Sequence, residues 1–534
     1  MTVQLRLSPA DQTAFDDALT ALVGTGFASR MAAQDAELWG PDAAPEAAKR
    51  LAWVSLAETS RHLVPEIEEL RARFASRGLN HVVLCGMGGS SLAPEVICAT
   101  EGRALHVLDS SDPDYVRASL ETNLETSIVV VSSKSGSTVE TDSQRRAYEA
   151  TFEAAGLDPR DHFVIVTDPG SPLDTQARES GYTVLNADPN VGGRYSALTA
   201  FGLVPCGLAG VDITRLLDQA AAIEPALQSD DRSNPALQLG AFLGVANDAG
   251  VDKVVLADDG SGLQRFGDWA EQLIAESTGK QGRGILPVVV TSLASANATP
   301  NTADEVIIAL GDDVPPASSG WAGAVRAPLG AALLLWEYAI PVAGSLIGIN
   351  PFDQPDVESA KAAARSLLDG HDDHPEPIFS DGSIDVYATD GLLDGRTEAS
   401  IEAALTELYA QVDIDHGYLA IMAYVDRDAH SDLSEVRKRL AARIGRPTTF
   451  GWGPRFLHST GQYHKGGAPT GVFLQITTDP VQDLAIPGRS FTFGGFIQAQ
   501  AVGDATVLTS KGRPVLRLHV HDDHGFKRIH EAIS

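Results

Sequence analysis

Short apolar runs alternate with helical stretches through the first two thirds of this chain. One group of runs covers residues 81–85, 104–108, 127–131 and 162–166, and a second group covers residues 254–257, 286–290, 306–310 and 346–349. Continuous apolar runs of this length, separated by helices, are typical of strands in a parallel sheet that is covered on both faces. The pattern therefore predicts two α/β units, each with a doubly wound parallel sheet.

The two ends of the chain have different patterns. Up to about residue 75, apolar side chains recur at helical spacing, for example at Phe15, Leu19 and Leu22, so we expect helices there. Residues 370–377 are rich in Asp, His and Pro, which is typical of a linker. Beyond it, strands are expected at residues 384–387, 418–424 and 471–476 and helices at 401–412 and 433–444. These elements predict a further α/β domain.

Chain length and composition fit this division. At roughly 150 residues per domain, about three domains are expected, and apolar residues make up 43% of the 534-residue chain, enough for a core in each. The predicted organisation is an N-terminal helical segment (1–75) packing on the first domain, two α/β domains (76–235 and 236–370) and a C-terminal α/β domain (371–534).

The charge balance is strongly acidic, with a formal net charge of -31. Such a field repels nucleic acids and anionic membranes, so neither is expected as a partner. It also repels an anionic substrate at long range. A phosphate site must therefore gather local donors, namely backbone N–H groups, hydroxyls, Arg and Lys. Surface acidity that serves only solubility is the alternative explanation.

Cysteine usage and apolar segments indicate a cytoplasmic protein. Cys85, Cys98 and Cys206 are too few and odd in number for a disulfide framework, which fits a reducing compartment. The first residues lack the basic and apolar segments of a signal peptide. The longest apolar stretch, residues 328–349, is interrupted by Glu337 and split by a proline and a glycine. It predicts a buried helix followed by a buried strand, not a membrane span.

Two polar turns follow predicted strands and could bind a phosphate. In the glycine turn, Gly86–Ser91, glycines allow close approach of the backbone to an anion, while Ser90 and Ser91 add hydroxyl donors. In the serine-lysine loop, Ser132–Thr138, five hydroxyls crowd into seven residues before a helix. Hydroxyls and amides at such a place bind phosphate by geometry and not by net charge. A turn made for packing and an ordinary N-cap cluster are the respective alternatives.

Three further motifs supply groups for proton transfer. Arg194 follows two glycines, which would let its guanidinium lie close to a ligand and steady a developing enediolate oxygen. Gln272 and Glu276 are four residues apart on one helix face, and a partly desolvated Glu276 would have its pKa raised toward the working pH. Gln354 follows an apolar run, and Lys361 lies on the next helix. Taken singly, a surface salt bridge and solvated side chains explain these residues equally well.

Two histidine clusters resemble metal sites, at residues 371–374 and 519–524. In the second, His519 and His521 have strand spacing and so share a face. Neither cluster has the thiol spacing of a structural zinc site, and both are interpreted as solvated loops. We therefore expect no metal ion and no cofactor.

Together, these motifs resemble those of the phosphoglucose isomerase family over residues 81–368. The resemblance rests on five motifs in order: Gly86–Ser90, Ser133–Thr141, Gly192–Ser196, Gln272 with Glu276–Lys280, and Asn350–Glu358 followed by Lys361. Ser stands in the phosphate loop where the family often has Thr, and Asp356 stands where Gly is usual. The long C-terminal extension is most similar to the isomerase half of bifunctional transaldolase/phosphoglucose isomerases. A transaldolase barrel would need roughly 250 more residues, so that activity is not expected in this chain.

The resemblance implies two sugar-isomerase (SIS-like) domains plus the C-terminal domain, and it implies the roles of individual residues. The catalytic residues would be Glu276 as base, Arg194 for the intermediate, and Lys361. The substrate-binding residues would be Gly89, Ser90, Ser133, Lys134, Ser135, Thr138, Gly193, Gln272 and Gln354. The family also carries a ring-opening histidine between the base and the last motif, but no histidine lies between Glu276 and Lys361 here. The run Ser459–Gly467 is a similar element, so His464 is the predicted ring-opening residue and His458 the second candidate.

The implied activity is reversible, metal-independent isomerisation of glucose 6-phosphate to fructose 6-phosphate through a cis-enediol. The expected partner is a small sugar phosphate, with a homodimer left open. A non-catalytic sugar-phosphate sensor is one alternative, although it would not need Glu276, Arg194 and Lys361 together. A metal-dependent sugar-phosphate isomerase that uses the histidine clusters is the other.

Overall fold

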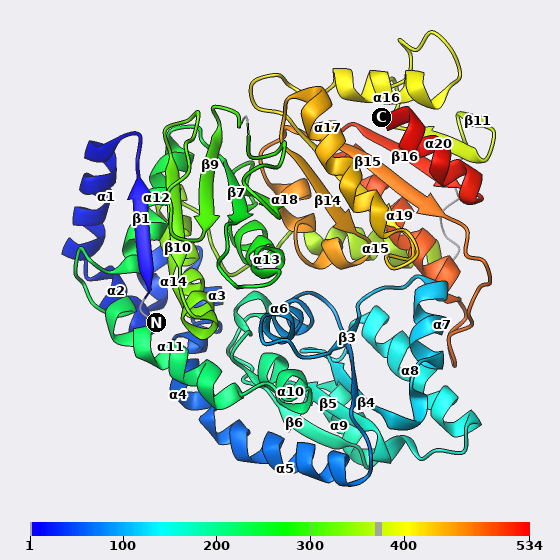
Figure 1. The fold of residues 1–534 in the computed structure, drawn as a ribbon, viewed down its shortest axis with the longest axis horizontal. Helices are drawn as coiled ribbons and strands as arrows, with labels where there is room; N and C mark the ends of the chain where they lie inside the picture. Colours follow the sequence, from blue (N-terminus) through cyan, green and yellow to red (C-terminus); the bar gives the residue numbers. More distant parts are fainter. Residues whose placement is uncertain (1–2, 300, 369–375, 534) are drawn as a thin grey trace.

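The computed structural model describes residues 3–299, 301–368 and 376–533, without the side chains of Glu358, Ala360 and Lys361. Three sheets, each flanked by helices, form the molecule (Figure 1). The α/β class and the parallel sheets predicted from the apolar runs are confirmed. The cluster at residues 371–374 lies outside the described residues.

The first sheet has strand order β3-β2-β4-β5-β6, and all its strand pairs are parallel. Its strands are β2 (His81–Gly86), β3 (His106–Leu108), β4 (Ser127–Ser132), β5 (Phe163–Thr167) and β6 (Thr183–Asn186). The helices of this region are α6 (Leu92–Thr100), α7 (Pro113–Glu121), α8 (Val139–Ala154), α9 (Pro172–Glu179) and α10 (Ala200–Leu208). Every residue of β4 and β5 is buried, because helices cover both faces of the sheet.

The second sheet has strand order β1-β10-β9-β7-β8. Its strands are β1 (Gln4–Ser8), β7 (Lys253–Asp258), β8 (Leu286–Val290), β9 (Glu305–Leu310) and β10 (Ala322–Arg326). The helices are α1 (Gln12–Gly24), α11 (Ile213–Leu227), α12 (Pro235–Asp248), α13 (Phe266–Thr278) and α14 (Leu329–Ile347). All neighbours are parallel except β1, which runs antiparallel to β10.

Two expectations for this region were wrong. The strand expected at residues 346–349 does not form, because α14 continues to Ile347 and ends at Gly348 in the left-handed region, with φ 78°. Pro341 is tolerated inside this buried helix, which packs against α12. The N-terminal segment is also not purely helical, since its first residues form β1 on the second sheet. Its later part does lie beside the first sheet, since α5 (Leu63–Ser76) packs against α10 and Leu51 forms a bridge with Val191.

The third sheet is mixed, with strand order β11-β12-β16-β15-β13-β14. Its strands are β11 (Phe379–Asp381), β12 (Ile384–Ala388), β13 (Tyr418–Tyr424), β14 (Thr448–Trp452), β15 (Gly471–Thr478) and β16 (Val515–Val520). The flanking helices are α15 (Val357–Leu368), α16 (Ile401–Ala410), α17 (Val436–Ile444), α19 (Phe493–Ser510) and α20 (Asp523–Ile533). α15 precedes the predicted linker but packs on α19, as Figure 1 shows at the centre right.

Packed apolar side chains join the three sheets. One cluster brings Val255 and Ile307 of the second sheet together with Tyr418 and Phe473 of the third. Another joins the first sheet to Phe493 of the C-terminal region. The C-terminal α/β region is thus held against both preceding sheets by buried contacts, as expected when apolar area is removed from water.

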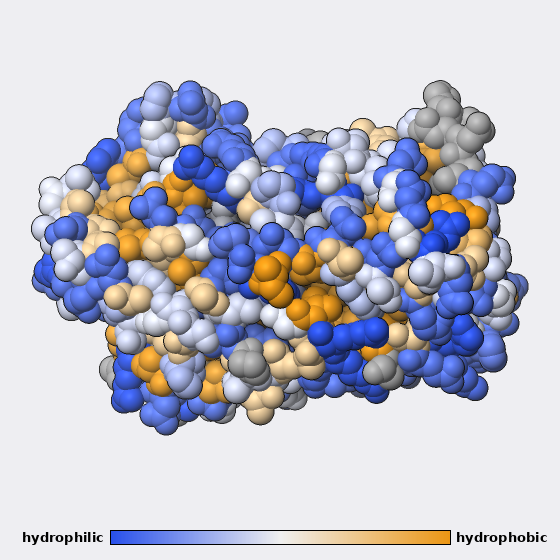
Figure 2. All heavy atoms as spheres, turned by 90° about the horizontal axis from the view of Figure 1, so that it is seen from above, coloured by the Kyte–Doolittle hydropathy of each residue, from blue (hydrophilic) through white to orange (hydrophobic). Residues whose placement is uncertain are grey.

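Two features can be compared with the expected surface charge and the expected absence of a membrane span: the outer surface and the long helix α14. On the face shown in Figure 2, hydrophilic residues lie between separate apolar patches. α14 has the length and apolar composition to cross a membrane, but 89% of its apolar window is buried inside the protein. A core helix of this kind meets the same criteria, so α14 is weak evidence for a membrane span.

Candidate active site

A cavity of about 540 Å³ lies where the polar turns after β2 and β4 meet α13 and segments of the C-terminal region. Its lining includes Gly89, Ser90, Ser133, Lys134, Ser135, Thr138, Gly193, Gln272, Glu276 and Gln354. All nine predicted substrate-binding residues and Glu276 are therefore in one place. Ligands bind at the carboxyl ends of parallel strands, and two strands of the first sheet end here.

The glycine turn approaches another backbone segment closely. A Cβ on Gly89 would lie 1.9 Å from the carbonyl oxygen of Gly193, and Gly88 has a positive φ of 56°. Only glycine is free of strain at both positions. The turn therefore brings the motif after β2 against the Gly192–Ser196 motif, which carries Arg194.

The serine-lysine loop holds its hydroxyls close together at the start of α8. Ser133 Oγ donates to Thr138 Oγ1 at 3.2 Å, and the hydroxyls of Ser135 and Ser137 are 2.7 Å apart. Thr138 is the N-cap residue, but its side chain makes no capping hydrogen bond to α8. The alternative of an ordinary N-cap cluster is therefore not supported, and the first N–H groups of α8 lie beside the cavity lining, where an anion could accept from them.

Lys134 in the same loop already has partners in the structure. Its Nζ lies 2.6 Å from Asp168 Oδ2 and donates to the carbonyl oxygen of Pro189 at 3.1 Å. Asp168 also lines the cavity. This ion pair offsets much of the lysine's charge, so an anion at this loop would rely mainly on hydroxyl and backbone N–H donors.

Arg194 is not among the lining residues, but it forms a buried ion pair with Glu276, which is. Arg194 Nε lies 3.2 Å from Glu276 Oε2, and the side chains are only 4% and 7% exposed. Arg194 Nη2 also donates to Gln354 Oε1 at 2.9 Å, and Gln272 Nε2 donates to Glu276 Oε2 at 3.4 Å. Four predicted residues from three separate motifs thus form one hydrogen-bonded group. A carboxylate beside a fixed positive charge can accept a proton while the charge stabilises a neighbouring oxyanion.

Lys280 fixes the loop that carries Gln354. Its Nζ donates to the carbonyl oxygens of Asn350 and Asp353 and to Asp353 Oδ1, each at 2.7 Å. Burial, followed by the nearby charge of Arg194, lowers the pKa of Lys280 to about 8. Lys280 belongs to the family motif that contains Glu276, but no separate role was predicted for it. Its hydrogen bonds connect the motif that contains Glu276 to the motif that contains Gln354.

The two candidate histidines occupy different environments. His464, on α18 (Gly461–Gly466), is buried away from the cavity, and its Nδ1 lies 3.0 Å from the hydroxyl of Tyr418. Burial lowers the pKa of His464 to about 3. His458, at the end of the short helix η9 (Arg455–His458), lines the cavity and places Nε2 3.0 Å from Glu140 Oε1. The structure thus brings the second candidate to the site and not the first.

The backbone of His458 also contacts two of the predicted motifs. Its carbonyl oxygen accepts from Gln272 Nε2 at 2.9 Å. A Cβ on Gly88 would lie 2.8 Å from the same oxygen. The C-terminal segment therefore packs directly on the glycine turn and on the helix that carries Glu276.

Several residues that line the cavity were not predicted from the sequence. Glu140 accepts from Gln500 Nε2 at 2.8 Å as well as pairing with His458. Lys465 lines the cavity and lies 2.5 Å from the buried Asp504 Oδ1. Arg50 and Arg365 complete the cations of the lining. Glu140 lies in the serine motif and Lys465 in the element around His464, whereas Arg50 and Gln500 come from distant segments and gave no signal in the sequence. Lys361 lies on α15, and its side chain is outside the described part of the chain.

Fold and site together define a class of protein with parallel α/β sheets whose polar turns enclose a cavity suited to a phosphorylated sugar. Comparison with known proteins gives the family. The sequence model for Phosphoglucose isomerase matches residues 59–288. A glucose-6-phosphate isomerase of Rippkaea orientalis is 30% identical over 54% of this chain and 65% of its own length. A probable glucose-6-phosphate isomerase of Natronomonas pharaonis is 30% identical over 57% of this chain and 82% of its own length.

The chain belongs to the phosphoglucose isomerase family. The match spans just under two thirds of the Rippkaea orientalis protein. Among solved structures, a hypothetical protein from Thermus thermophilus superposes with a TM-score of 0.58 and 25% identity over 68% of this chain and 100% of that chain. A glucose-6-phosphate isomerase from Chlamydia trachomatis, at 20% identity, has the same fold, with a TM-score of 0.55 over 70% of this chain and 89% of its own.

Proposed function

We propose that this protein interconverts glucose 6-phosphate and fructose 6-phosphate through a cis-enediol. The observation that carries the proposal is the buried ion pair of Arg194 with Glu276, because Glu276 lines the same cavity as the serine-lysine loop. Membership of the family and its similarity to glucose-6-phosphate isomerases support the same activity. The three cysteines are free and buried, which supports a location in the reducing cytoplasm as part of this proposal.

Substrate phosphate binds in the serine-lysine loop. The hydroxyls of Ser133, Ser135 and Thr138 and the first N–H groups of α8 donate to its oxygens, with Ser90 and the backbone of Gly89 adding donors from the glycine turn. These groups are neutral donors, which suits a chain whose net charge is -31. The other end of the sugar then extends toward Gln272, Glu276 and Gln354.

Proton transfer is the task of Glu276. Its carboxylate takes the proton from C2 of the open-chain aldose, and the electron pair forms the enediolate with charge on the C1 oxygen. Arg194, held by its bond to Gln354 Oε1, stabilises that oxygen. The C1 oxygen takes up a proton to give the cis-enediol, the C2 hydroxyl gives up its proton as the C2 carbonyl forms, and Glu276 returns its proton to C1, which gives the ketose. Lys361 remains a candidate by resemblance alone.

Ring opening is assigned to His458 in place of His464. The task requires a proton to leave the anomeric hydroxyl and another to reach the ring oxygen, and His458 lines the cavity whereas His464 is packed among Tyr418 and Phe473. A bond from His458 Nε2–H to Glu140 would set the tautomer in which Nδ1 accepts a proton. In this arrangement Nε2 orients the ring through Glu140, and Nδ1 exchanges the proton with the sugar.

Neither rival has a supporting observation. A sensor that only binds sugar phosphate has no need of a buried carboxylate–guanidinium pair. The described groups able to hold a metal are Asp479, His519 and His521, and none of these lines the cavity. Whether the active form is a homodimer stays a separate proposal, tested by the mass of the protein in solution.

A coupled assay tests the proposal. Purified protein is given fructose 6-phosphate, and glucose 6-phosphate is detected through NADP reduction by a glucose-6-phosphate dehydrogenase. Steady turnover that is lost in Glu276→Gln supports the proposal. Binding of fructose 6-phosphate without turnover would favour the sensor, and turnover that Glu276→Gln retains would remove this site from the chemistry.

A further inference from the structure

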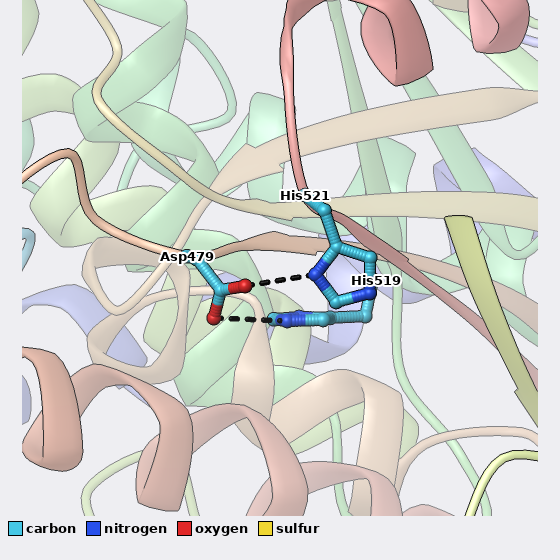
Figure 3. Close-up of side chains that lie close together, drawn as sticks. All are labelled: Asp479, His519 and His521. Atoms are coloured by element: carbon cyan, nitrogen blue, oxygen red, sulfur yellow. Dashed lines mark hydrogen bonds and ion pairs between the residues drawn. The ribbon is translucent and has the colours of Figure 1, made fainter. Parts of the chain in front are cut away.

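Three side chains converge at the carboxyl ends of two neighbouring strands of the third sheet (Figure 3). Asp479 directly follows β15, His519 lies near the end of β16, and His521 directly follows β16. His519 Nε2 is 3.2 Å from Asp479 Oδ1, and His521 Nδ1 is 2.8 Å from Asp479 Oδ2. One carboxylate is thus held between two imidazoles.

Sheet register accounts for this convergence. β15 and β16 are parallel, and Thr477 pairs with His519 across the ladder. Because side chains alternate along a strand, His519 and His521 point to the same side. Asp479 is two residues beyond Thr477, so it reaches the same edge. The sequence interval between Asp479 and the histidines is about 40 residues, which is why no spacing motif revealed the group.

Each imidazole also has a second hydrogen-bond partner, on the ring nitrogen that does not contact Asp479. His519 Nδ1 lies 2.8 Å from the hydroxyl of Thr477, and His521 Nε2 lies 3.0 Å from Asp385 Oδ2 on β12. On both rings, therefore, the nitrogen that faces away from Asp479 has an oxygen partner. Metal-binding histidines have this arrangement, because the second partner fixes the tautomer and orients the ring. Solvated surface histidines have no need of it.

We propose that Asp479, His519 and His521 bind a divalent transition-metal ion of the zinc type. His519 Nε2, His521 Nδ1 and one oxygen of Asp479 are the protein ligands, and water completes the coordination. These atoms lie within 4.8 Å of one another. A tetrahedral ion about 2.0–2.2 Å from each ligand needs separations of roughly 3.3 Å, so small side-chain rotations suffice. Two imidazoles favour Zn²⁺ over Mg²⁺ or Ca²⁺, which prefer oxygen ligands.

The site is accessible and separate from the sugar-phosphate cavity. The side chains of Asp479 and His521 are 55% and 40% exposed, whereas that of His519 is 14% exposed. None of the three lines the cavity. An ion here would join the ends of β15 and β16 and, through Asp385, the antiparallel strand β12. The opposing explanation is a metal-free ion cluster in which a protonated His521 bridges Asp479 and Asp385.

Calorimetric titration of the chelator-treated full chain with ZnCl₂ tests the proposal. We expect one ion per chain, with Mg²⁺ binding much more weakly. Loss of a partner that only orients a ligand costs about 10- to 100-fold in affinity, so Asp385→Ala should weaken binding within that range. A larger loss is expected when a ligand itself is removed, as in His519→Ala, His521→Ala and Asp479→Ala. His524→Ala, an exposed histidine next to the site, is the matched control and should keep the affinity of the parent.

Two further measurements separate binding from folding. Each variant is checked by far-UV circular dichroism and by its isomerase activity, which the three ligand substitutions should leave intact. Co²⁺ in place of Zn²⁺ should give a visible absorption band that disappears in His519→Ala. No uptake of Zn²⁺ by the parent would establish the metal-free ion cluster, and uptake that survives all three ligand substitutions would place the ion elsewhere. Either result overturns the proposal.

Discussion

Two short helical segments that follow β14 carry a histidine each, and they differ in what surrounds that histidine. His458 ends η9 and lies at the cavity, paired with Glu140. His464, six residues later, is 3% exposed and stacks on Tyr418 with 5.8 Å between ring centroids. The segment between them turns the chain from the cavity into the core that joins the second and third sheets.

This difference shows that a sequence motif does not by itself determine where its histidine lies in the structure. The glycines and glutamine around His464 resemble a known ring-opening element, yet they serve packing here. A Cβ on Gly279 would lie 2.5 Å from the Cα of Tyr463, and Gln462 Nε2 donates to the carbonyl oxygen of Gly279 at 2.9 Å. The element thus docks the C-terminal region on the end of α13, and this docking brings His458 to the cavity.

The largest expected effect concerns the base on α13, the helix on which both histidine segments dock. Glu276→Gln keeps the shape of the side chain and removes the proton acceptor, so kcat should fall by at least about 10²-fold with substrate binding largely kept. Steady-state kinetics with fructose 6-phosphate measure this. Glu271→Gln is the matched control on the same helix, because Glu271 lines a separate cavity of about 480 Å³. Equal losses in both variants would indicate damage to α13 and not loss of a base.

The second prediction sharpens the contrast between the histidines directly. His458→Ala should slow turnover of ring-closed glucose 6-phosphate by up to about 10²-fold, the lower end for a positioned acid–base group. It should affect proton exchange on an open-chain analogue much less, because that substrate needs no ring opening. His464→Ala should slow both substrates only slightly. A larger and selective loss in His464→Ala would return ring opening to His464 and reverse the comparison.

The third prediction concerns pH. His464 has its pKa lowered from 6.5 to about 3 by burial, so the unfolded chain binds a proton that the folded chain does not between these values. Stability is unaffected by this group above pH 6.5 and is lost as the pH falls below it. From about pH 7.5 to about pH 5 the loss should reach about 2 kcal/mol.

Denaturant unfolding at the two pH values measures this loss. His464→Asn, which can still bond to Tyr418 but cannot titrate, should show a smaller dependence on pH over this interval. Identical dependence in the parent and His464→Asn would show that His464 is not held neutral in the folded protein.

The smallest expected effect is that of chelation on turnover. A chelator should leave the rate unchanged, because Asp479, His519 and His521 are not part of the cavity lining. The same treatment should lower the temperature of unfolding if the ion proposed at the third sheet is bound. An enzyme that loses activity on chelation and regains it with added divalent cation would instead support a metal-dependent reaction.

Local patterns of the sequence were sufficient for most of the parallel strands, both polar turns and the face shared by Gln272 and Glu276. Apolar runs report burial on both faces, and helical spacing reports which side chains share a face, so each signal lies within a few residues. The structure then brings the nine predicted binding residues to one cavity. Where local pattern and fold disagreed, at residues 346–349, an apolar run could form either a strand or the end of a buried helix.

Only tertiary structure decided the remaining features. β1 pairs with a strand more than 300 residues away, and Arg50, His458 and Gln500 reach the cavity from separate segments. Asp479 meets two histidines because two strands are adjacent and in register. Such contacts depend on how whole elements pack, which removes apolar surface from water without leaving a local pattern at the residues brought together. The choice between His458 and His464 belongs to this second group, because it depends on how α18 docks on α13.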